Sequence, residues 1–181
     1  MSVVGAGTMG NGIAQVFAQT GWHVTLIDVQ AQQLEKALQT IGKNLDRLIT
    51  KGILPADAKE KTLGNLTTST SIQEGVKDSS IVIEAATENQ DLKVKILKQL
   101  DAMLAPEIII ASNTSSISIT QLAAVTSRAD RFIGMHFFNP VPMMALVEII
   151  RGLQTSDETH DAVHALATAL GKTPITVKNA P

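Results

Sequence analysis

The stretch from Ser2 to Gly10 constrains the fold of this chain more than any other. A short apolar run leads directly into the pattern glycine-x-glycine-x-x-glycine, which ends at Gly10. The residues that follow are typical of a helix, because Ile13, Val16 and Phe17 fall on one face at helical spacing. A strand that turns through such a loop into a helix predicts an α/β domain that binds a dinucleotide.

Each glycine of this loop has a distinct physical role in that prediction. Gly5 makes the tight turn after the strand, Gly7 lets the backbone approach a pyrophosphate, and Gly10 allows the helix to pack closely on the strand. The helix N-terminus adds free N–H groups and a partial positive charge. We therefore expect the whole loop to contact the cofactor: Gly5, Ala6, Gly7, Thr8, Met9 and Gly10.

The second predicted strand, residues 23–28, indicates which dinucleotide binds. Asp28 lies 18 residues after Gly10, close to the spacing of the acid that binds a ribose 2′-hydroxyl. Val29 and Gln30 follow, so no arginine stands there to meet a 2′-phosphate, and NAD is favoured over NADP. The alternative is a glycine-rich turn in another kind of α/β protein, with Asp28 as a helix cap.

Composition excludes several other classes of protein. The chain has 181 residues, a net charge of −2 and no cysteine, which predicts no nucleic-acid or membrane partner and no disulfide. No apolar run is long enough to span a membrane, and the first strand leaves no room for a signal peptide. We expect a cytoplasmic protein and one domain over residues 1–181, with both ends resembling those of a fragment.

Apolar runs and helical patterns alternate along the rest of the chain. Strands are expected at residues 66–69, 80–85, 108–112, 132–137, 146–150 and 175–177, and helices at 31–51, 56–61, 71–75, 91–104, 119–124 and 157–170. This alternation predicts a Rossmann-type, doubly wound α/β fold with a mainly parallel sheet and helices on both faces. The last strands add extra β-structure near the C-terminus.

Ligands of open α/β sheets bind outside the carboxyl ends of the strands. The polar residues expected at those ends are Thr87, Glu88 and Asn89 after the fourth strand, Asn113, Thr114 and Ser115 after the fifth, and His136 at the end of the sixth.

His136 lies in an apolar run, and Glu148 lies in the next strand. If the two strands form a hairpin across residues 139–145, these residues face each other, and a buried glutamate there needs a partner. A carboxylate on one imidazole nitrogen would fix the tautomer and leave the other nitrogen as a base. The alternatives are a core histidine bonded to backbone, and an outward-facing Glu148 on an edge strand.

Two histidines of one helix and four basic residues of another could each be functional or merely lie on a solvent-exposed helix face. His160 and His164 lie one helical turn apart, but no acid or cysteine cluster accompanies them, so we expect no metal site. The basic residues Lys36, Lys43, Arg47 and Lys51 share a face of the second helix, which is either a solvated surface or an attraction for phosphate groups.

At these residues the chain resembles the NAD-binding domain of L-3-hydroxyacyl-CoA dehydrogenases, in particular the bacterial 3-hydroxybutyryl-CoA dehydrogenases. The resemblance covers essentially the whole chain. The blocks that carry it lie at residues 5–10, 84–89, 111–116 and 134–142, together with Leu146, Val147 and Glu148.

The resemblance implies a role for specific side chains. His136 is then the catalytic base, Glu148 orients it, and Ser115 hydrogen-bonds the substrate oxygen. The implied NAD contacts are Asp28, Glu88, Lys93, Ser115 and Asn139, and the implied coenzyme A contacts are Asn44, Lys51 and Ser115. Position 44 is asparagine in this chain, whereas family members more often have serine there.

The resemblance also implies a partner domain. The family has a helical C-terminal domain that closes the substrate cleft and forms a homodimer, and the sequence ends just before it would begin. We therefore expect an oxidoreductase that interconverts L-3-hydroxyacyl-CoA and 3-oxoacyl-CoA with NAD. Two alternatives are a non-catalytic NAD-binding module and a dehydrogenase of a free hydroxy acid, similar to the gulonate-oxidising relatives of lens crystallin.

Overall fold

The computed structural model describes residues 1–178; the last three residues of the expected domain, 179–181, lie outside the described part. Its strands are β1 (Ser2–Val4), β2 (Val24–Ile27), β3 (Leu66–Ser69), β4 (Ile81–Glu84), β5 (Ile109–Ser112), β6 (Phe132–Phe137), β7 (Leu146–Arg151) and β8 (Thr173–Lys178). Its helices are α1 (Thr8–Gln19), α2 (Ala31–Thr50), α3 (Ala58–Gly64), α4 (Ile72–Val76), α5 (Gln90–Met103), α6 (Ile119–Ala124), a 3-10 turn η1 (Ala129–Arg131) and α7 (Asp157–Ala169).

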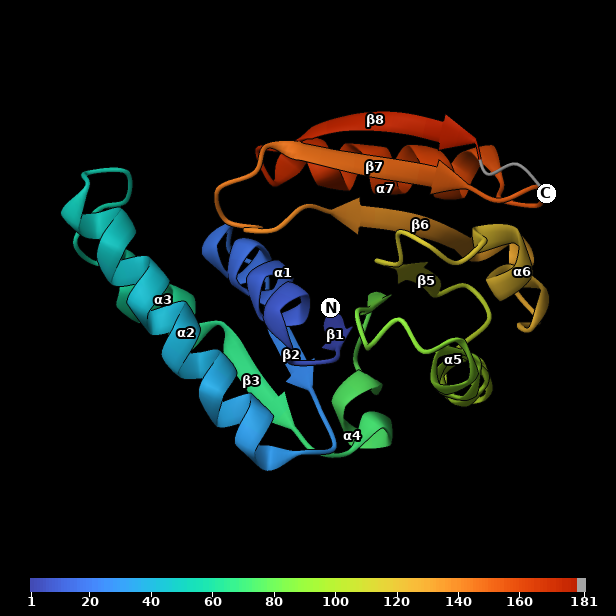
Figure 1. Ribbon diagram of the computed structural model, residues 1–181, viewed down its shortest axis with the longest axis horizontal. Helices are drawn as coiled ribbons and strands as arrows, with labels where there is room; N and C mark the ends of the chain where they lie inside the picture. Colours follow the sequence, from blue (N-terminus) through green and yellow to red (C-terminus); the bar gives the residue numbers. More distant parts are fainter. Residues whose placement is uncertain (179–181) are drawn as a thin grey trace.

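The strands form one sheet in the order β3-β2-β1-β4-β5-β6-β7-β8. The first six are mutually parallel, β7 runs antiparallel to β6, and β8 runs parallel to β7 (Figure 1). The chain reverses its order at β1 and β4, which is the point where ligands bind in open sheets of this kind. The predicted doubly wound fold and its extra C-terminal strands are confirmed.

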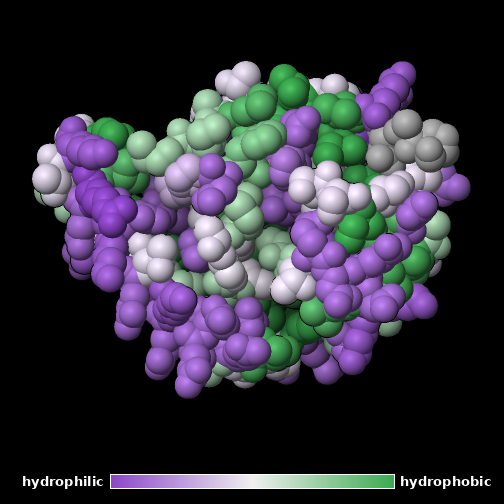
Figure 2. All heavy atoms as spheres, viewed as in Figure 1, coloured by the Kyte–Doolittle hydropathy of each residue, from purple (hydrophilic) through white to green (hydrophobic). Residues whose placement is uncertain are grey.

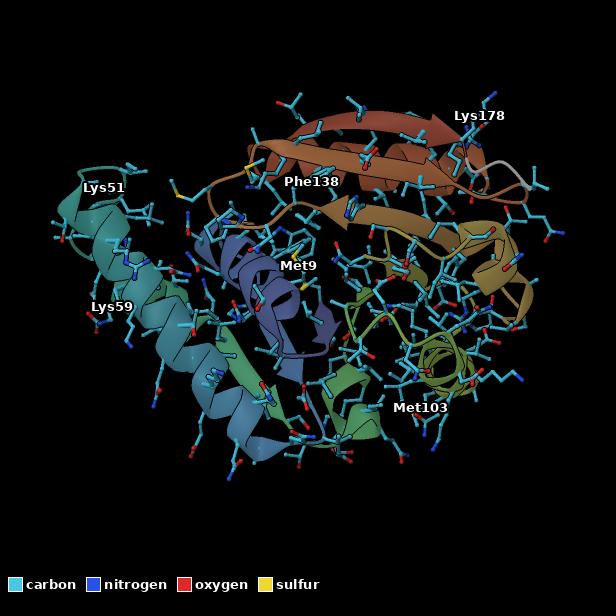
Figure 3. All side chains as sticks on the ribbon, viewed as in Figure 1. Met9, Lys51, Lys59, Met103, Phe138 and Lys178 are labelled. Carbon is cyan, nitrogen blue, oxygen red and sulfur yellow. The ribbon has the colours of Figure 1, made fainter. Side chains whose placement is uncertain are left out.

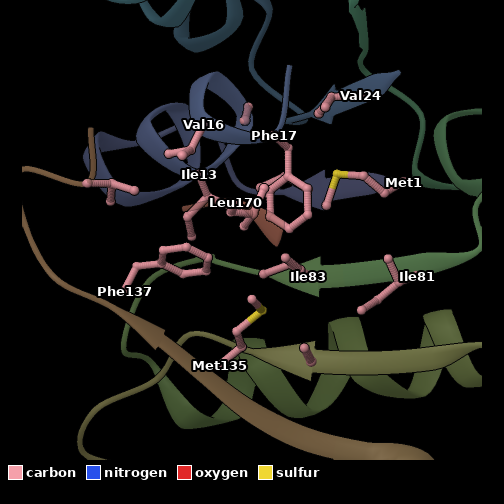
Figure 4. Packing of buried hydrophobic residues seen from close by; sticks show 14 of the residues in the cluster. Met1, Ile13, Val16, Phe17, Val24, Ile81, Ile83, Met135, Phe137 and Leu170 are labelled. Carbon is pink, nitrogen blue, oxygen red and sulfur yellow. The ribbon is translucent and has the colours of Figure 1, made fainter. Parts of the chain in front are cut away.

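Alternation along the strands sends side chains to two separate cores, because successive residues of a strand point to opposite faces. Val3 and Ile83 pack with α1, α2 and α7 on one face, and Val4 and Val82 pack with α4, α5 and α6 on the other. Figure 4 shows the first core, where Phe17 of α1 packs over the strands. The helices therefore hold the carboxyl ends of β1, β4, β5 and β6 at one edge.

In α2, Ala37 is fully buried, whereas Leu38 and Ile49 are only partly buried. One expected helix boundary needs correction. The short helix expected at 56–61 is α3, at Ala58–Gly64, because the N–H of Ala58 donates to the carbonyl of Pro55 at 3.0 Å and forms a turn first. Among the described residues, none of the helices has the length and apolar character needed to cross a membrane.

Candidate active site

The glycine loop joins β1 to α1 with contacts that only glycine permits. Gly5 has φ of +107°, and a Cβ there would lie 2.7 Å from the carbonyl oxygen of Ala85. A Cβ on Gly10 would lie 1.7 Å from the carbonyl oxygen of Gly5. The helix can therefore begin directly at the carboxyl end of β1 only with glycine at both positions.

Gly7 has a different environment, which fits a bound phosphate group. A Cβ on Gly7 would meet no atom within 4 Å, so nothing within the described chain requires glycine there. Gly7 is also the N-cap of α1, and no side chain caps that helix end. Open space in front of uncapped N–H groups at a helix N-terminus suits the pyrophosphate of a dinucleotide.

Asp28 follows β2 and lies beside this loop. Its Oδ2 accepts from the N–H of Ala6 at 3.0 Å, and its Oδ1 accepts from the N–H of Gln30 at 2.9 Å. The carboxylate is therefore fixed next to the phosphate-binding turn, and it retains acceptor capacity for ribose hydroxyls. Its predicted role toward the adenosine ribose remains a prediction that this geometry supports.

His136 and Glu148 are direct cross-strand partners in the β6–β7 hairpin, and the predicted register is confirmed. Nδ1 of His136 lies 2.9 Å from Oε1 of Glu148. The histidine side chain is 16% exposed and the glutamate 29%, so the pair is partly withdrawn from water. Because the carboxylate occupies Nδ1, Nε2 is the nitrogen that this arrangement leaves to exchange a proton with a ligand.

Glu88 lies in the segment after β4 and bonds to the segment after β5. Its Oε2 accepts from the hydroxyl of Thr114 at 2.7 Å and also from the hydroxyl of Ser116. Partial burial is the largest single influence on the pKa of Glu88 and acts to raise it, and the hydrogen bonds from Ser116 and Thr114 act in the opposite direction. Together with the charges of Lys93 and His136 they hold the pKa of Glu88 below its usual value, so it is a carboxylate at neutral pH.

Lys93, expected to contact NAD, is only 1% exposed in the structure. Its ammonium donates to Oε2 of Glu84 at 2.7 Å and to the carbonyl oxygen of Ala86 at 3.2 Å. Glu84 is fully buried and also accepts from the hydroxyl of Ser112 at 2.7 Å. Glu84 is not among the site residues predicted from the sequence. An acid that ends an otherwise apolar strand, nine residues before a lysine, is the signal that could have found it.

Ser115 and Asn139 lie at the same edge as the pair. Ser115 is exposed in the loop after β5, and Asn139 is exposed in the loop after β6. Asn113, on the loop of Ser115, accepts from the backbone N–H of Phe137 at 2.9 Å and so ties that loop to the strand of His136.

Two clefts border this edge on the side of α2. A cleft of about 310 Å³ is lined by Gly7 and Thr8 of the glycine loop, by Asn44 of α2 and by Asn139. A second cleft of about 190 Å³ is lined by Asn44, Lys51 and the loop after β6, and it has a mostly apolar wall.

Of the basic residues on α2, Lys36 lines the larger cleft, and Arg47 and Lys51 line the smaller. The outer face of α2 is hydrophilic in Figure 2. Figure 3 shows Lys51 at the outer end of α2, far from Met9 and Phe138 at the centre of the molecule. Of the predicted coenzyme A residues, Asn44 lines both clefts and Lys51 lines the smaller one.

Neither His160 nor His164 lies in this site. His160 bonds to Asp161 at 2.9 Å and to Thr176 at 2.8 Å, which ties α7 to β8. Within residues 1–178, no group of three or more histidine, aspartate or glutamate side chains is placed to hold a metal ion.

The class of protein is a Rossmann-type nucleotide-binding domain with a polar site next to the cofactor position. The features typical of it are the phosphate-binding turn, the acid after β2 and the histidine–carboxylate pair at the carboxyl edge of the sheet. The family model described as "3-hydroxyacyl-CoA dehydrogenase, NAD binding domain" matches residues 1–180. The chain belongs to this family, and the expectation of an NAD-binding domain is confirmed.

Individual relatives agree with this assignment. The chain is 49% identical to a probable 3-hydroxybutyryl-CoA dehydrogenase of Deinococcus radiodurans over 99% of this chain and 64% of the relative. It is 48% identical to the 3-hydroxybutyryl-CoA dehydrogenase of Bradyrhizobium diazoefficiens over 95% of this chain and 58% of the relative. The crystal structure of (S)-3-hydroxybutyryl-CoA dehydrogenase from Ralstonia eutropha superposes with a TM-score of 0.96 at 62% identity, covering 99% of this chain and 63% of that one. The chain thus spans about three fifths of the length of these relatives.

Proposed function

We propose that this chain is the cofactor-binding and catalytic part of an NAD-dependent L-3-hydroxyacyl-CoA dehydrogenase that acts on short acyl chains such as 3-hydroxybutyryl-CoA. The observation that carries the proposal is the His136–Glu148 pair, with 2.9 Å between Nδ1 and Oε1, at the sheet edge that also holds the glycine loop. The names of the relatives at 48% and 49% identity supply the substrate class.

The residues of the chain divide the reaction between them. NAD, when bound, supplies the acceptor for the hydride that leaves C3 of the substrate. His136 takes the proton of the 3-hydroxyl on Nε2, and Glu148 stabilises the imidazolium that forms. Ser115 donates a hydrogen bond to the substrate oxygen as its charge changes.

Cofactor and coenzyme A are held by the loops and helices around this site. The glycine loop, residues 5–10, receives the pyrophosphate at the N-terminus of α1, and Asp28 receives the adenosine ribose. Glu88 and Asn139 face the same edge and complete the cofactor site. Asn44 and Lys51 line the smaller cleft, whose apolar wall and basic rim suit a linear carrier with phosphate groups.

We further propose that the active enzyme is longer than residues 1–181 and forms a cytoplasmic homodimer through a helical domain that follows them. The support is the length of the relatives, of which this chain covers 58% and 64%. Lys93 is also part of the proposed cofactor site. Its side chain is buried, and its ammonium lies 3.8 Å from Oε1 of Glu88.

The test is a substrate panel on the full-length enzyme with NADH formation as the readout. We expect oxidation of (S)-3-hydroxybutyryl-CoA and no oxidation of free 3-hydroxybutyrate or gulonate at equal concentration. Oxidation of the free acids without coenzyme A would overturn the substrate class. Tight NAD binding by calorimetry with no turnover of any substrate would instead indicate a binding module.

A further inference from the structure

The segment that contains Ser115 is attached to two glutamates by the hydroxyl groups of residues 112, 114 and 116. Ser112 donates to Oε1 of Glu84 at 2.7 Å, and Thr114 and Ser116 both donate to Oε2 of Glu88. The two residues that flank Ser115 therefore share one carboxylate oxygen. A single acceptor fixes the backbone on both sides of the predicted substrate-binding serine.

The accepting carboxylates are themselves fixed from the other side. The buried ammonium of Lys93 lies 2.7 Å from Oε2 of Glu84 and 3.8 Å from Oε1 of Glu88. Its bond to the carbonyl oxygen of Ala86 ties the same group to the backbone between the two acids. The buried pair is that of Lys93 with Glu84, and it fixes the ammonium in place. Glu88, whose side chain is 49% exposed, is attracted to this fixed charge at 3.8 Å.

Glu88 faces the Ser115 loop with one oxygen and Lys93 with the other. Only the carboxylate form accepts both hydroxyl bonds together with the ammonium charge, and the same bonds keep the pKa of Glu88 low. On the far side of the loop, Asn113 accepts from the N–H of Phe137, beside His136. The loop is thus attached both to the Glu88 cluster and to the strand that carries the histidine.

We propose that Glu88 is a positioning residue for Ser115, acting through the hydroxyls of Thr114 and Ser116, in addition to any contact it makes with the cofactor. The inference rests on the proposed function, since it concerns the placement of Ser115 against the substrate oxygen. Misplacement of a catalytic group by about 1 Å is enough to cost a large part of the rate. The two hydroxyls therefore set kcat without touching substrate.

The test removes the donors and leaves Glu88 intact, because Glu88 also belongs to the predicted cofactor site. Thr114→Val keeps the shape of a side chain that is 1% exposed, and Ser116→Ala changes an exposed residue that carries little risk to folding. Thr67→Val, at an exposed position of the edge strand β3, is the matched control. We expect the double variant to lower kcat of the full-length enzyme about tenfold at saturating NAD, with a smaller change in the NAD dissociation constant and no effect of Thr67→Val.

A double-mutant cycle with Ser115→Ala separates positioning from a general structural effect. If the hydroxyls act through Ser115, their removal causes no further loss of kcat in the Ser115→Ala background. An equal loss in both backgrounds would overturn the inference, as would an unchanged kcat or an effect confined to NAD affinity. If Thr114→Val lowers the melting temperature, the same double-mutant cycle is measured with Ser116→Ala alone, because Ser116 is exposed. A wild-type enzyme inactive on the CoA substrate would refute the proposed function instead.

Discussion

Glu148 stands directly opposite His136 in the antiparallel ladder of β6 and β7, and its Oε1 atom is 2.9 Å from Nδ1 of the imidazole. Side chains of such a pair leave the same face of the sheet, so the hairpin register alone brings acid and histidine together. The loop between the strands is fixed in turn by Lys172, which donates to the carbonyl oxygens of Val141 and Met144 at 2.7 Å each. The geometry of the pair follows from the fold and requires no ligand.

Neutralising Glu148 should remove catalysis and spare the fold. Glu148→Gln keeps the shape of the side chain but withdraws the charge that stabilises the imidazolium, so we expect kcat to fall on the order of 10²-fold or more, by analogy with the acid of a catalytic triad. Initial-rate measurements on the full-length enzyme check this, with the exposed Glu107→Gln as control. Near-normal kcat in Glu148→Gln would make Glu148 a structural residue.

Ser115 should contribute to the chemical step and not only to cofactor binding. Ser115→Ala removes a hydrogen-bond donor to the substrate oxygen, and the loss of one such donor costs roughly 10²-fold in kcat. Steady-state kinetics with varied NAD and varied substrate separate the two roles. A change confined to the Michaelis constant for NAD would show that Ser115 serves the cofactor alone.

Cofactor choice should depend on the charge of Asp28. A carboxylate fixed 3.0 Å from the N–H of Ala6 accepts from ribose hydroxyls and repels a 2′-phosphate. We expect NAD to bind at least tenfold more tightly than NADP, about 1.4 kcal/mol, and Asp28→Asn to narrow that ratio. Titration calorimetry with each cofactor gives the ratio directly; equal affinities in the wild type would refute the role.

Arg128 should be a main determinant of stability. This side chain is 4% exposed and donates to the backbone carbonyls of Asp101, Leu104, Ala105 and Ile108. Replacement by methionine removes these four bonds at the end of α5 and also the charge paired with Asp101, which should cost about 3 kcal/mol or more. Urea unfolding measures the loss. Arg131→Met is the control, because among the described residues the side chain of Arg131 makes a single long bond, 3.4 Å to the carbonyl oxygen of Glu107.

Stability should also fall in acid through Asp101. Burial acts to raise the pKa of Asp101, but hydrogen bonds from Arg128 and Ser127 outweigh it and hold the pKa below its usual value. A pKa lowered in the folded state stabilises the protein above the pKa of the unfolded chain, and that stabilisation disappears as the pH falls toward the folded value. Asp101→Asn should therefore flatten the decline of the unfolding free energy below about pH 4. An unchanged slope would contradict this linkage.

Much of the site could be predicted from the sequence because its signals are local. The glycine spacing, the position of Asp28 and the hairpin register of His136 and Glu148 depend only on residues near each other in the chain or in adjacent strands. In the Glu84–Lys93–Ser112 cluster, only the acid at the end of β4 and the lysine nine residues later have a local signal. The bond from Ser112 could not be predicted, since it joins two strands through a side-chain contact. The helix α3 begins two residues later than the sequence predicts, because the turn at Pro55 leaves no distinct hydrophobic pattern.

The most direct test of the account is the rate of NADH formation from (S)-3-hydroxybutyryl-CoA by the full-length enzyme and its His136→Gln variant, measured side by side at saturating NAD. We expect turnover by the wild type, a loss of at least about 10²-fold in the variant, and equal NAD affinity in both. A His136→Gln variant that keeps the wild-type rate would contradict the central claim.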